Sequence, residues 1–279
     1  MTHLVPTLDH VVINVRDQID RGHDVFTRLG FTLTPRGYHT LGSMNHLAMF
    51  GTDYLELIAA ETGNTKRPEI LDSPEGLDGL VFGTEDSAAT FAALEQAAVP
   101  VFPPGEFSRP VVLLDGARDA VFRTVRLRPG TVPAGRLYFC QHFTRDLVWR
   151  DEWRHHANGV TGIARAVIAD QNPNQWATLF RQMFGDTAVR PIKEGFVLTV
   201  GVSCFDVISL AALRAQYGTA APDPAGRTSF MAALVLRTQS LDAAWTAIQA
   251  GGIADVRRTI DNVIVPAAEA FGATLVFCL

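Results

Sequence analysis

The stretch TLDHVVINV, residues 7–15, has the composition of a buried β-strand that carries one histidine, His10, among aliphatic residues. This strand begins a pattern of segments that occurs four times in the chain: a strand-like run, a polar turn, an amphipathic helix and shorter extended segments. The four runs are LDHVVINV from residue 8, LDGLVFGT from 77, VTGIARAVIA from 160 and FMAALVLRT from 230. The sequence therefore predicts an internal repeat that begins with this strand.

The spacing of the runs predicts a duplication. The first and third runs begin 152 residues apart and the second and fourth 153 apart, so two kinds of unit alternate along the chain. The ends of the units agree as well, because GTDYLELIAA at 51–60 matches GVSCFDVISL at 201–210, and LYFC at 137–140 resembles LVFC at 275–278. Two similar halves follow from these matches.

Each unit reads as one helix among four strands. The helical segments end at residues 31, 101, 186 and 254, and Ser87 and Ser240 are the expected N-caps of the second and fourth. In the first unit FTLTPRGY and NHLAMF add two short strands, which makes the unit βαβββ. We predict an α+β fold of four such modules in two halves, residues 1–145 and 146–279, with a packed connector at 144–159.

The overall composition and charge limit the classes of binding partner that this protein suits. The 279 residues are 47% apolar, with a net charge of −5 and scattered basic residues, which favours neither nucleic acid nor a membrane surface. The N-terminus does not read as a signal peptide and no apolar run reaches the length of a membrane span, so we expect a cytoplasmic protein. Its three cysteines are expected to be structural thiols. A small-molecule partner fits best, and a second copy of the chain is a further candidate as a homodimer.

Strand parity brings His10 and Glu56 to one face. Side chains two apart in a strand share a face, so His10 lies with Leu8 and Val12, and Glu56 lies with Tyr54. If the uninterrupted aliphatic set packs against the helices, His10 and Glu56 project into one cleft. A carboxylate within an apolar strand needs a partner. His10 suits that role either as a co-ligand of a metal or as a hydrogen-bonded imidazole without one.

A divalent metal needs more than two protein ligands, and the second unit offers few. Gly79 takes the position of His10 there, and His142 is the best third ligand, with Gln141 less suitable. In the second half we expect Gly162 to correspond to His10 and Asp206 to Glu56. We therefore expect that half to be mainly structural, or to bind a ligand without metal.

Further polar residues near the first cleft are candidates for binding a substrate. Arg36, His46 and Tyr138 are predicted to contact it, since arginine and histidine suit carboxylate or phosphate groups. His39 and Asn45 lie beside them in the sequence, and ordinary exposed polar residues remain the alternative for this region.

These residues carry a family resemblance. The βαβββ repeat, LDHVVINV, RLGFTL, NHLAMFG and YLELIA resemble the glyoxalase-like branch of the vicinal oxygen chelate superfamily, which includes glyoxalase I, bleomycin-resistance proteins and extradiol dioxygenases. The resemblance implies curved mixed sheets around a cleft, with metal ligands on the first and last strands of each module. His10, Glu56 and His142 would then hold a divalent ion such as Zn, Fe, Mn or Ni, and Glu56 would also be the catalytic residue that moves a proton.

Two functions remain open at this point. One is a metal-dependent lyase, isomerase or dioxygenase acting on a small oxygen-rich molecule; the other is a metal-free protein that sequesters a small molecule, of the bleomycin-resistance type. A duplicated scaffold whose role is association is a third. Fold alone does not choose among them.

Overall fold

The computed structural model describes residues 3–113 and 116–279, and these residues form two eight-stranded mixed sheets. The first sheet has the order β2 (Gly37–Tyr38), β3 (Met44–Met49), β4 (Tyr54–Ala59), β1 (Leu8–Asn14), β5 (Gly76–Gly83), β8 (Arg136–His142), β7 (Gly116–Arg126), β6 (Gly105–Leu113). The second has the order β10 (Val189–Ile192), β11 (Gly195–Val200), β12 (Ser203–Ile208), β9 (Val160–Asp170), β13 (Ser229–Thr238), β16 (Thr274–Cys278), β15 (Val263–Val265), β14 (Arg257–Arg258). The α-helices of these residues are α1 (Ile19–Arg28), α2 (Pro68–Asp72), α3 (Ser87–Gln96), α4 (Asn174–Phe184), α5 (Leu210–Tyr217) and α6 (Leu241–Ala250).

Both sheets have the same internal pairing, which confirms the predicted βαβββ modules. In the first sheet β1 pairs parallel with β4 and antiparallel with β5, and β5 pairs parallel with β8. The strands β9, β12, β13 and β16 repeat this pattern in the second sheet. The first and last strands of every module therefore lie at the centre of a sheet. The helices α2 and α5, which follow β4 and β12, are additions that the repeat does not predict.

One apolar core joins the two halves. The face of the first sheet that carries Val11 and Ile13, here called its outer face, shares a single cluster of buried residues with the face of the second sheet that carries Ile168. Phe82 of β5 packs against Phe184 and Phe205 of the second half, with ring centroids 4.8 and 5.6 Å apart. The halves are thus fastened by aromatic packing across their outer faces.

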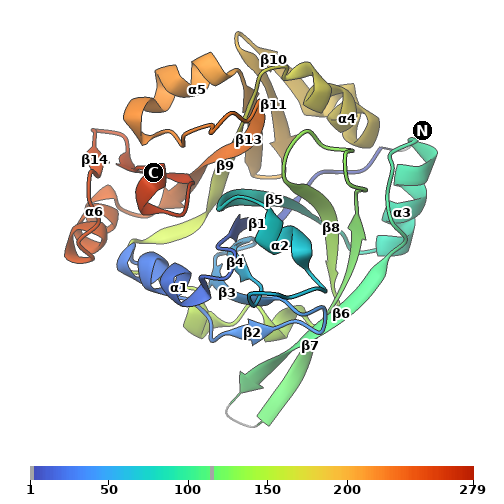
Figure 1. The fold of residues 1–279 in the computed structure, drawn as a ribbon, viewed down its shortest axis with the longest axis horizontal. Coiled ribbons are helices and arrows are strands. Elements are labelled where there is room, and N and C mark those ends of the chain that lie inside the picture. The colour runs from blue at the N-terminus through green and yellow to red at the C-terminus, as the bar shows by residue number, and fades with distance from the viewer. Residues whose placement is uncertain (1–2, 114–115) are drawn as a thin grey trace.

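The opposite, inner faces have separate clusters. On the first sheet Ile70 of α2 packs with Val12 and Val81, and Figure 1 shows α2 in front of these strands. The first sheet also comes close to closing on itself, because the Thr40 N–H next to β2 donates to the Ser108 carbonyl of β6 over 3.0 Å. This curvature encloses space between the inner face and α2.

Two local expectations have different outcomes. Ser240 caps α6 as predicted, since its side chain accepts from the Ala243 N–H. The N-cap of α3 is Asp86 rather than Ser87, because the Asp86 carboxylate accepts from two N–H groups of the first turn and Ser87 is the first helical residue. A carboxylate at this end also favours the helix dipole.

The connector at 144–159 is packed, as predicted from its charged and aromatic composition. His156 donates from Nε2 to the Met49 carbonyl over 2.8 Å, and Asn158 donates to the Leu29 carbonyl over 3.0 Å. His155, by contrast, is exposed. The connector therefore bonds back to the first half before β9 begins.

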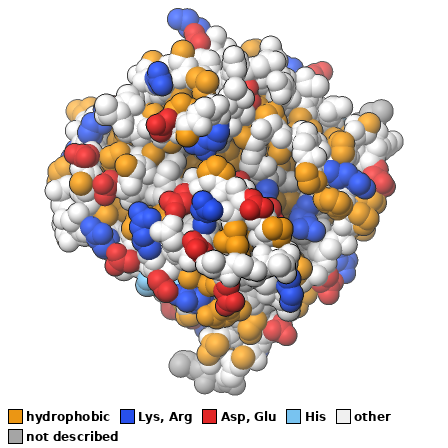
Figure 2. Space-filling view, in the orientation of Figure 1, with side chains coloured by type: hydrophobic (Ala, Val, Ile, Leu, Met, Phe, Trp, Pro, Cys, Tyr) orange, Lys and Arg blue, Asp and Glu red, His pale blue; other side chains and the backbone are white. Residues whose placement is uncertain are grey.

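The surface carries mixed charges. Figure 2 shows lysine and arginine side chains interspersed with aspartate and glutamate over the face seen in Figure 1. Among the helices of the described residues, none combines the length and the apolar character that crossing a bilayer requires.

Replacing Phe82 with alanine tests the shared core. Phe82 is fully buried between the halves, so Phe82→Ala should lower the free energy of unfolding by about 3–5 kcal/mol. Urea denaturation followed by fluorescence measures this. Phe143→Ala is the matched control, since Phe143 is 47% exposed and should cost about 1 kcal/mol or less. Equal losses in the two variants would contradict the shared core.

Candidate functional site

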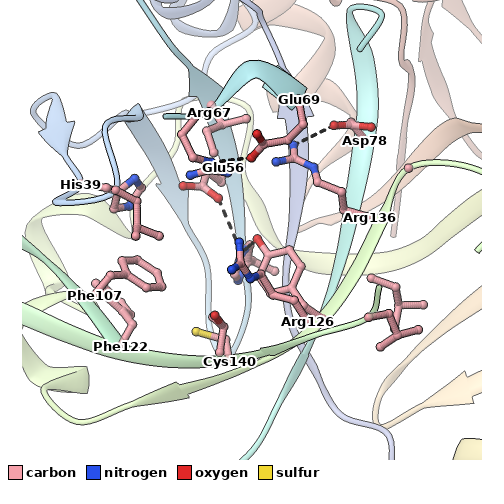
Figure 3. Close-up of a pocket in the computed structure, with 18 of the residues that line it drawn as sticks. His39, Glu56, Arg67, Glu69, Asp78, Phe107, Phe122, Arg126, Arg136 and Cys140 are labelled. Carbon is pink, nitrogen blue, oxygen red and sulfur yellow. Dashed lines mark hydrogen bonds and ion pairs between the residues drawn. The ribbon is translucent and has the colours of Figure 1, made fainter. Parts of the chain in front are cut away.

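The inner face of the first sheet encloses a cavity of about 570 Å³. Its polar lining includes the histidines and the carboxylate of the central strands together with arginines of the outer strands, while Phe107 and Phe122 form an apolar wall (Figure 3). The lining includes His10, His39, Asn45, Tyr54, Glu56, Arg67, Glu69, Asp78, Phe107, Arg109, Phe122, Arg136, Tyr138 and Cys140. A cavity with an apolar wall and converging polar groups is the usual form of a small-molecule site.

A β-bulge positions His10. Leu8 lies opposite Phe82 and His10 lies opposite Val81, so Asp9 is an extra residue in β1. Leu8 consequently packs on the outer core with Val11, three residues later, and does not share the face of His10 as simple parity predicts. The imidazole of His10 instead stacks on Tyr54, with ring centroids 4.4 Å apart and 15° between the planes.

Asp9 is a buried carboxylate between two histidines. Its Oδ1 lies 2.5 Å from His10 Nδ1, and its Oδ2 lies 3.0 Å from His142 Nε2. Burial raises the pKa of a carboxyl group, but the charge of His142 and the hydrogen bonds from both imidazoles outweigh it, so the pKa of Asp9 lies well below its ordinary value. Asp9 is therefore ionised at neutral pH and accepts from both rings.

This arrangement fixes which nitrogen of His10 faces the cavity. In the neutral ring Nδ1 donates to Asp9, so Nε2 carries the lone pair and accepts from the Tyr138 hydroxyl over 3.1 Å. Burial raises the pKa of Tyr138 well above its ordinary value, so the phenol stays protonated and can donate.

Glu56 faces the same nitrogen. Its Oε2 lies 3.6 Å from His10 Nε2, and its Oε1 accepts from Asn45 Nδ2 over 2.6 Å. Burial raises the pKa of this carboxyl group, yet the positive charges that His10 and His39 carry when protonated, together with the Asn45 hydrogen bond, outweigh burial and lower it. Two electron-rich atoms, a carboxylate oxygen and an imidazole nitrogen, thus face each other across a short gap in the cavity.

His39 completes the polar end of the cavity. Its Nδ1 lies 2.9 Å from Ser43 Oγ and its Nε2 lies 3.3 Å from Asn45 Nδ2. Burial lowers the pKa of His39 to about 4, with Arg109 and Arg67 adding to the effect and Glu56 opposing it. The ring is therefore neutral at pH 7.

The second module supplies no further ligand at the matching positions. By strand register His10 lies opposite Tyr54 and Val12 opposite Glu56 in the first module, whereas Gly79 lies opposite Arg136 and Val81 opposite Tyr138 in the second. Gly79 therefore takes the place of His10, as the sequence predicts, and Tyr138 takes that of Glu56. A Cβ at Gly79 would stand 2.9 Å from Val12 Cβ, so a ligating side chain does not fit there without a shift.

The structure places the residues predicted from sequence in two groups. His10, Glu56 and Tyr138 line the cavity together. Arg36 pairs instead with Asp20, and His46 donates from Nδ1 to the Thr34 carbonyl over 2.8 Å with its ring beside His23 of α1. Asn45 lines the cavity, so its strand neighbour His46 points to the other face.

His142 lies behind Asp9 rather than beside Glu56. Asp9, Cys140 and His142 have ligand atoms within 4.8 Å of one another and form a group that could hold a metal. Burial raises the pKa of the Cys140 thiol well above its ordinary value, which disfavours the thiolate that a metal requires. His142 therefore connects to His10 through the Asp9 carboxylate.

The donor set fits a divalent ion at His10 and Glu56. The Nε2 atom of His10, which the Tyr138 hydroxyl contacts, and an ionised carboxylate face one cavity, and a carboxylate behind the imidazole is the arrangement that orients metal-binding histidines. Two protein ligands fall short of the three that catalytic zinc sites use, which leaves the remaining positions to a bound molecule.

The second half replaces this pair with a closed ion pair. Strand register puts Arg165 opposite Cys204 and Val167 opposite Asp206, so Arg165, and not Gly162, corresponds to His10. The prediction of Gly162 was wrong because β9 is longer than β1 and its register is displaced by three residues. Arg165 donates to Asp206, the counterpart of Glu56. Tyr217 of α5 belongs to the apolar cluster on this inner face.

Asp9, Asp78 and Arg109 were not predicted as site residues from the sequence, although the two aspartates share a position in the repeat. Asp9 precedes His10 and Asp78 precedes Gly79 at the same point of the repeat, so the shared LD pair was a visible sign of a common role. Both aspartates lie where the pairing of β1 with β5 is interrupted. Arg109 of β6 has no such sign, because its place in the cavity depends on the closure of the sheet.

Comparison with known proteins identifies the family. A model of the glyoxalase-like domain matches residues 8–184, which is more than half of the chain. The chain therefore belongs to the glyoxalase-like domain family. A comparison with curated proteins found no match.

Solved structures share the fold at low sequence identity. A hypothetical protein from Staphylococcus aureus has a TM-score of 0.69 and 14% identity over 98% of this chain and 99% of its own. A xylose isomerase-like TIM barrel/4-hydroxyphenylpyruvate dioxygenase fusion protein has a TM-score of 0.60 and 13% identity, and the match covers 100% of this chain and 49% of the fusion protein. A mutant of 4-hydroxymandelate synthase from Streptomyces coelicolor has a TM-score of 0.57 and 13% identity, and the match covers 99% of this chain and 93% of the synthase. These likenesses concern the fold alone.

The lowered pKa of His39 predicts a pH dependence of stability. Between pH 6.5, its ordinary value, and about 4, the unfolded chain binds a proton that the folded ring does not. The free energy of unfolding should therefore fall as the pH is lowered through this window, and His39→Gln should remove that share of the loss. Urea denaturation of both proteins at pH about 7 and about 4.5 measures it. The same loss in both would contradict the assignment.

Proposed function

We propose that the first half of this chain is a metal-dependent enzyme of lyase, isomerase or dioxygenase type that acts on a small oxygen-rich molecule. The observation that carries the proposal is the gap of 3.6 Å between His10 Nε2 and Glu56 Oε2 inside the cavity. Both atoms are acceptors when Nδ1 of His10 donates to Asp9, so a cation or a proton between them would stabilise the pair.

In this proposal His10 and Glu56 would hold the ion, and Asp9 would orient His10. A divalent ion there would act as a Lewis acid toward the oxygen atoms of the bound molecule. Glu56, ionised and held by Asn45, is suited to accept a proton from the molecule, and the protonated phenol of Tyr138 is suited to donate a hydrogen bond. Phe107 and Phe122 exclude water from one wall.

The proposed setting is cytoplasmic, where thiols remain reduced. Cys140, Cys204 and Cys278 are all free. Family membership supports this type of function but does not choose the reaction.

A metal-free binding protein is the second candidate, and a specific observation favours it. The ligand positions of the second module are Gly79 and Tyr138, and the Tyr138 hydroxyl bonds to the nitrogen of His10 that would otherwise bind a metal. In this alternative His10 and Glu56 share a proton and the cavity sequesters its ligand unchanged.

Elemental analysis of protein purified without chelator separates the two candidates. We expect a divalent metal near one equivalent per chain that is lost in the folded variants His10→Ala and Glu56→Ala, because each removes one of two protein ligands. Asp9→Asn should weaken metal affinity by about 10- to 100-fold, as loss of an orienting carboxylate does.

Two further variants complete the comparison. His155→Ala is the control, since His155 is exposed and outside the cavity, and it should retain the metal. His142→Ala should behave like Asp9→Asn and not like His10→Ala, because His142 contacts Asp9 and not Glu56. An intact fold without metal uptake in the unmodified chain would exclude the enzyme proposed here and leave the binding protein.

A further inference from the structure

Arg109 of β6 is a buried guanidinium without a partner. The residue is 3% exposed and lines the cavity, and its side chain makes no hydrogen bond or ion pair with any residue that the structure describes. Its Nη2 in particular is fully buried and unpaired. A buried charge in a protein is ordinarily paired, because leaving it alone costs several kcal/mol.

Two half-buried arginines of the cavity each have a carboxylate partner within the chain. Arg67 pairs with Glu69, and Arg136 Nη2 lies 2.7 Å from Asp78 Oδ2, as the dashed lines in Figure 3 mark. Burial lowers the pKa of Arg109, and Tyr54 and Glu56 oppose this effect only in part. The Glu56 oxygens face Asn45 and His10 and form no ion pair with the guanidinium. Lys66, Arg126 and Arg128 also line the cavity but are exposed to solvent. Arg109 is thus the buried cation of the cavity for which the described residues supply no counter-charge.

The surroundings of Arg109 are built to admit it. A Cβ at Gly37 would stand 2.8 Å from Arg109 Nη1 and 2.5 Å from Asn45 Oδ1, so the glycine leaves room for both polar groups. Asn45 in turn donates to Glu56. An anion bound to Arg109 would therefore lie next to the Asn45–Glu56 end of the cavity.

An apolar wall lies beside this polar end. Phe107 and Phe122 stack with ring centroids 5.2 Å apart and 21° between their planes. Phe107 also meets the edge of His39 at 5.4 Å. The cavity thus offers a charged anchor and a flat apolar surface to the same ligand.

We propose that the molecule bound in the cavity carries a carboxylate or phosphate group that pairs with Arg109, and an apolar or aromatic body that packs on Phe107 and Phe122. The inference rests on the proposed function in so far as the cavity is a ligand site. It does not depend on a metal or on the reaction.

The test uses three small probes with one ring: benzoate, phenyl phosphate and the neutral benzamide, each titrated by calorimetry into the full chain in buffer of low chloride content. The unmodified protein should bind benzoate or phenyl phosphate about tenfold to a hundredfold more tightly than benzamide, as charged hydrogen bonds of this kind imply. Whichever of benzoate and phenyl phosphate binds more tightly shows whether Arg109 prefers a carboxylate or a phosphate group.

Variants assign the effect to Arg109. Arg109→Met should lose the preference for the anion and keep or raise the melting temperature of the free protein, because it removes a buried charge with no partner. Arg109→Lys should retain part of the preference. Arg123→Met is the matched control on the neighbouring strand, since Arg123 is half-buried and paired with Glu106 outside the cavity.

Several results would overturn the inference. They are equal binding of benzamide and the anions, no binding of either anion, or a large drop in the melting temperature of Arg109→Met while Arg109→Lys stays folded and binds no anion. Metal content is measured on the same samples. Anion binding without metal would refute the metal-dependent enzyme and leave this inference standing, and metal without anion binding would do the reverse.

Discussion

The outer faces of both sheets are committed to one shared apolar core, and the rest of the structure depends on this constraint. Val11, Ile13 and Phe82 are fully buried there together with residues of the second half. Because side chains alternate along a strand, every strand that gives one face to the core has its other face free. The inner faces can therefore change in character without loosening the attachment of the halves, and the first half uses that freedom to hold buried charge.

Most charged side chains on the inner face of the first sheet have a hydrogen-bond or ion-pair partner of their own. Asp9 accepts from two imidazoles, Glu56 is held by Asn45, and Arg67 and Arg136 have carboxylate partners. Removing any member would leave its partner buried and unpaired, which is costly in a low dielectric. A network of this kind fixes side-chain positions more firmly than apolar packing alone, and that rigidity suits a site whose polar groups must keep one geometry. The exceptions, the gap at His10 and the lone Arg109, stand out against it.

The sequence predicts the fold well because the repeat and the strand periodicity are local signals. Units that begin at residues 8, 77, 160 and 230 correspond to β1, β5, β9 and β13, and parity places His10 and Glu56 in the same cavity. It fails where geometry departs from strict alternation or depends on long-range closure. The bulge at Asp9 breaks the period of two, the longer β9 displaces the register so that Arg165 replaces Gly162, and His46 next to Asn45 must face the other way. Arg109 enters the cavity only because β6 approaches the Thr40 side of the sheet.

The two halves form an internal comparison that separates what the fold requires from what a site requires. In the second half Arg165 and Asp206 take the places of His10 and Glu56 and neutralise each other, while Tyr217 of α5 joins the apolar cluster of that face. The fold is thus complete with a closed ion pair and an apolar inner face. In the first half the same two positions hold atoms that both accept hydrogen bonds, 3.6 Å apart, beside an arginine without a counter-charge. The second half has the same fold without either feature, so the two features distinguish the candidate site of the first half from the common scaffold.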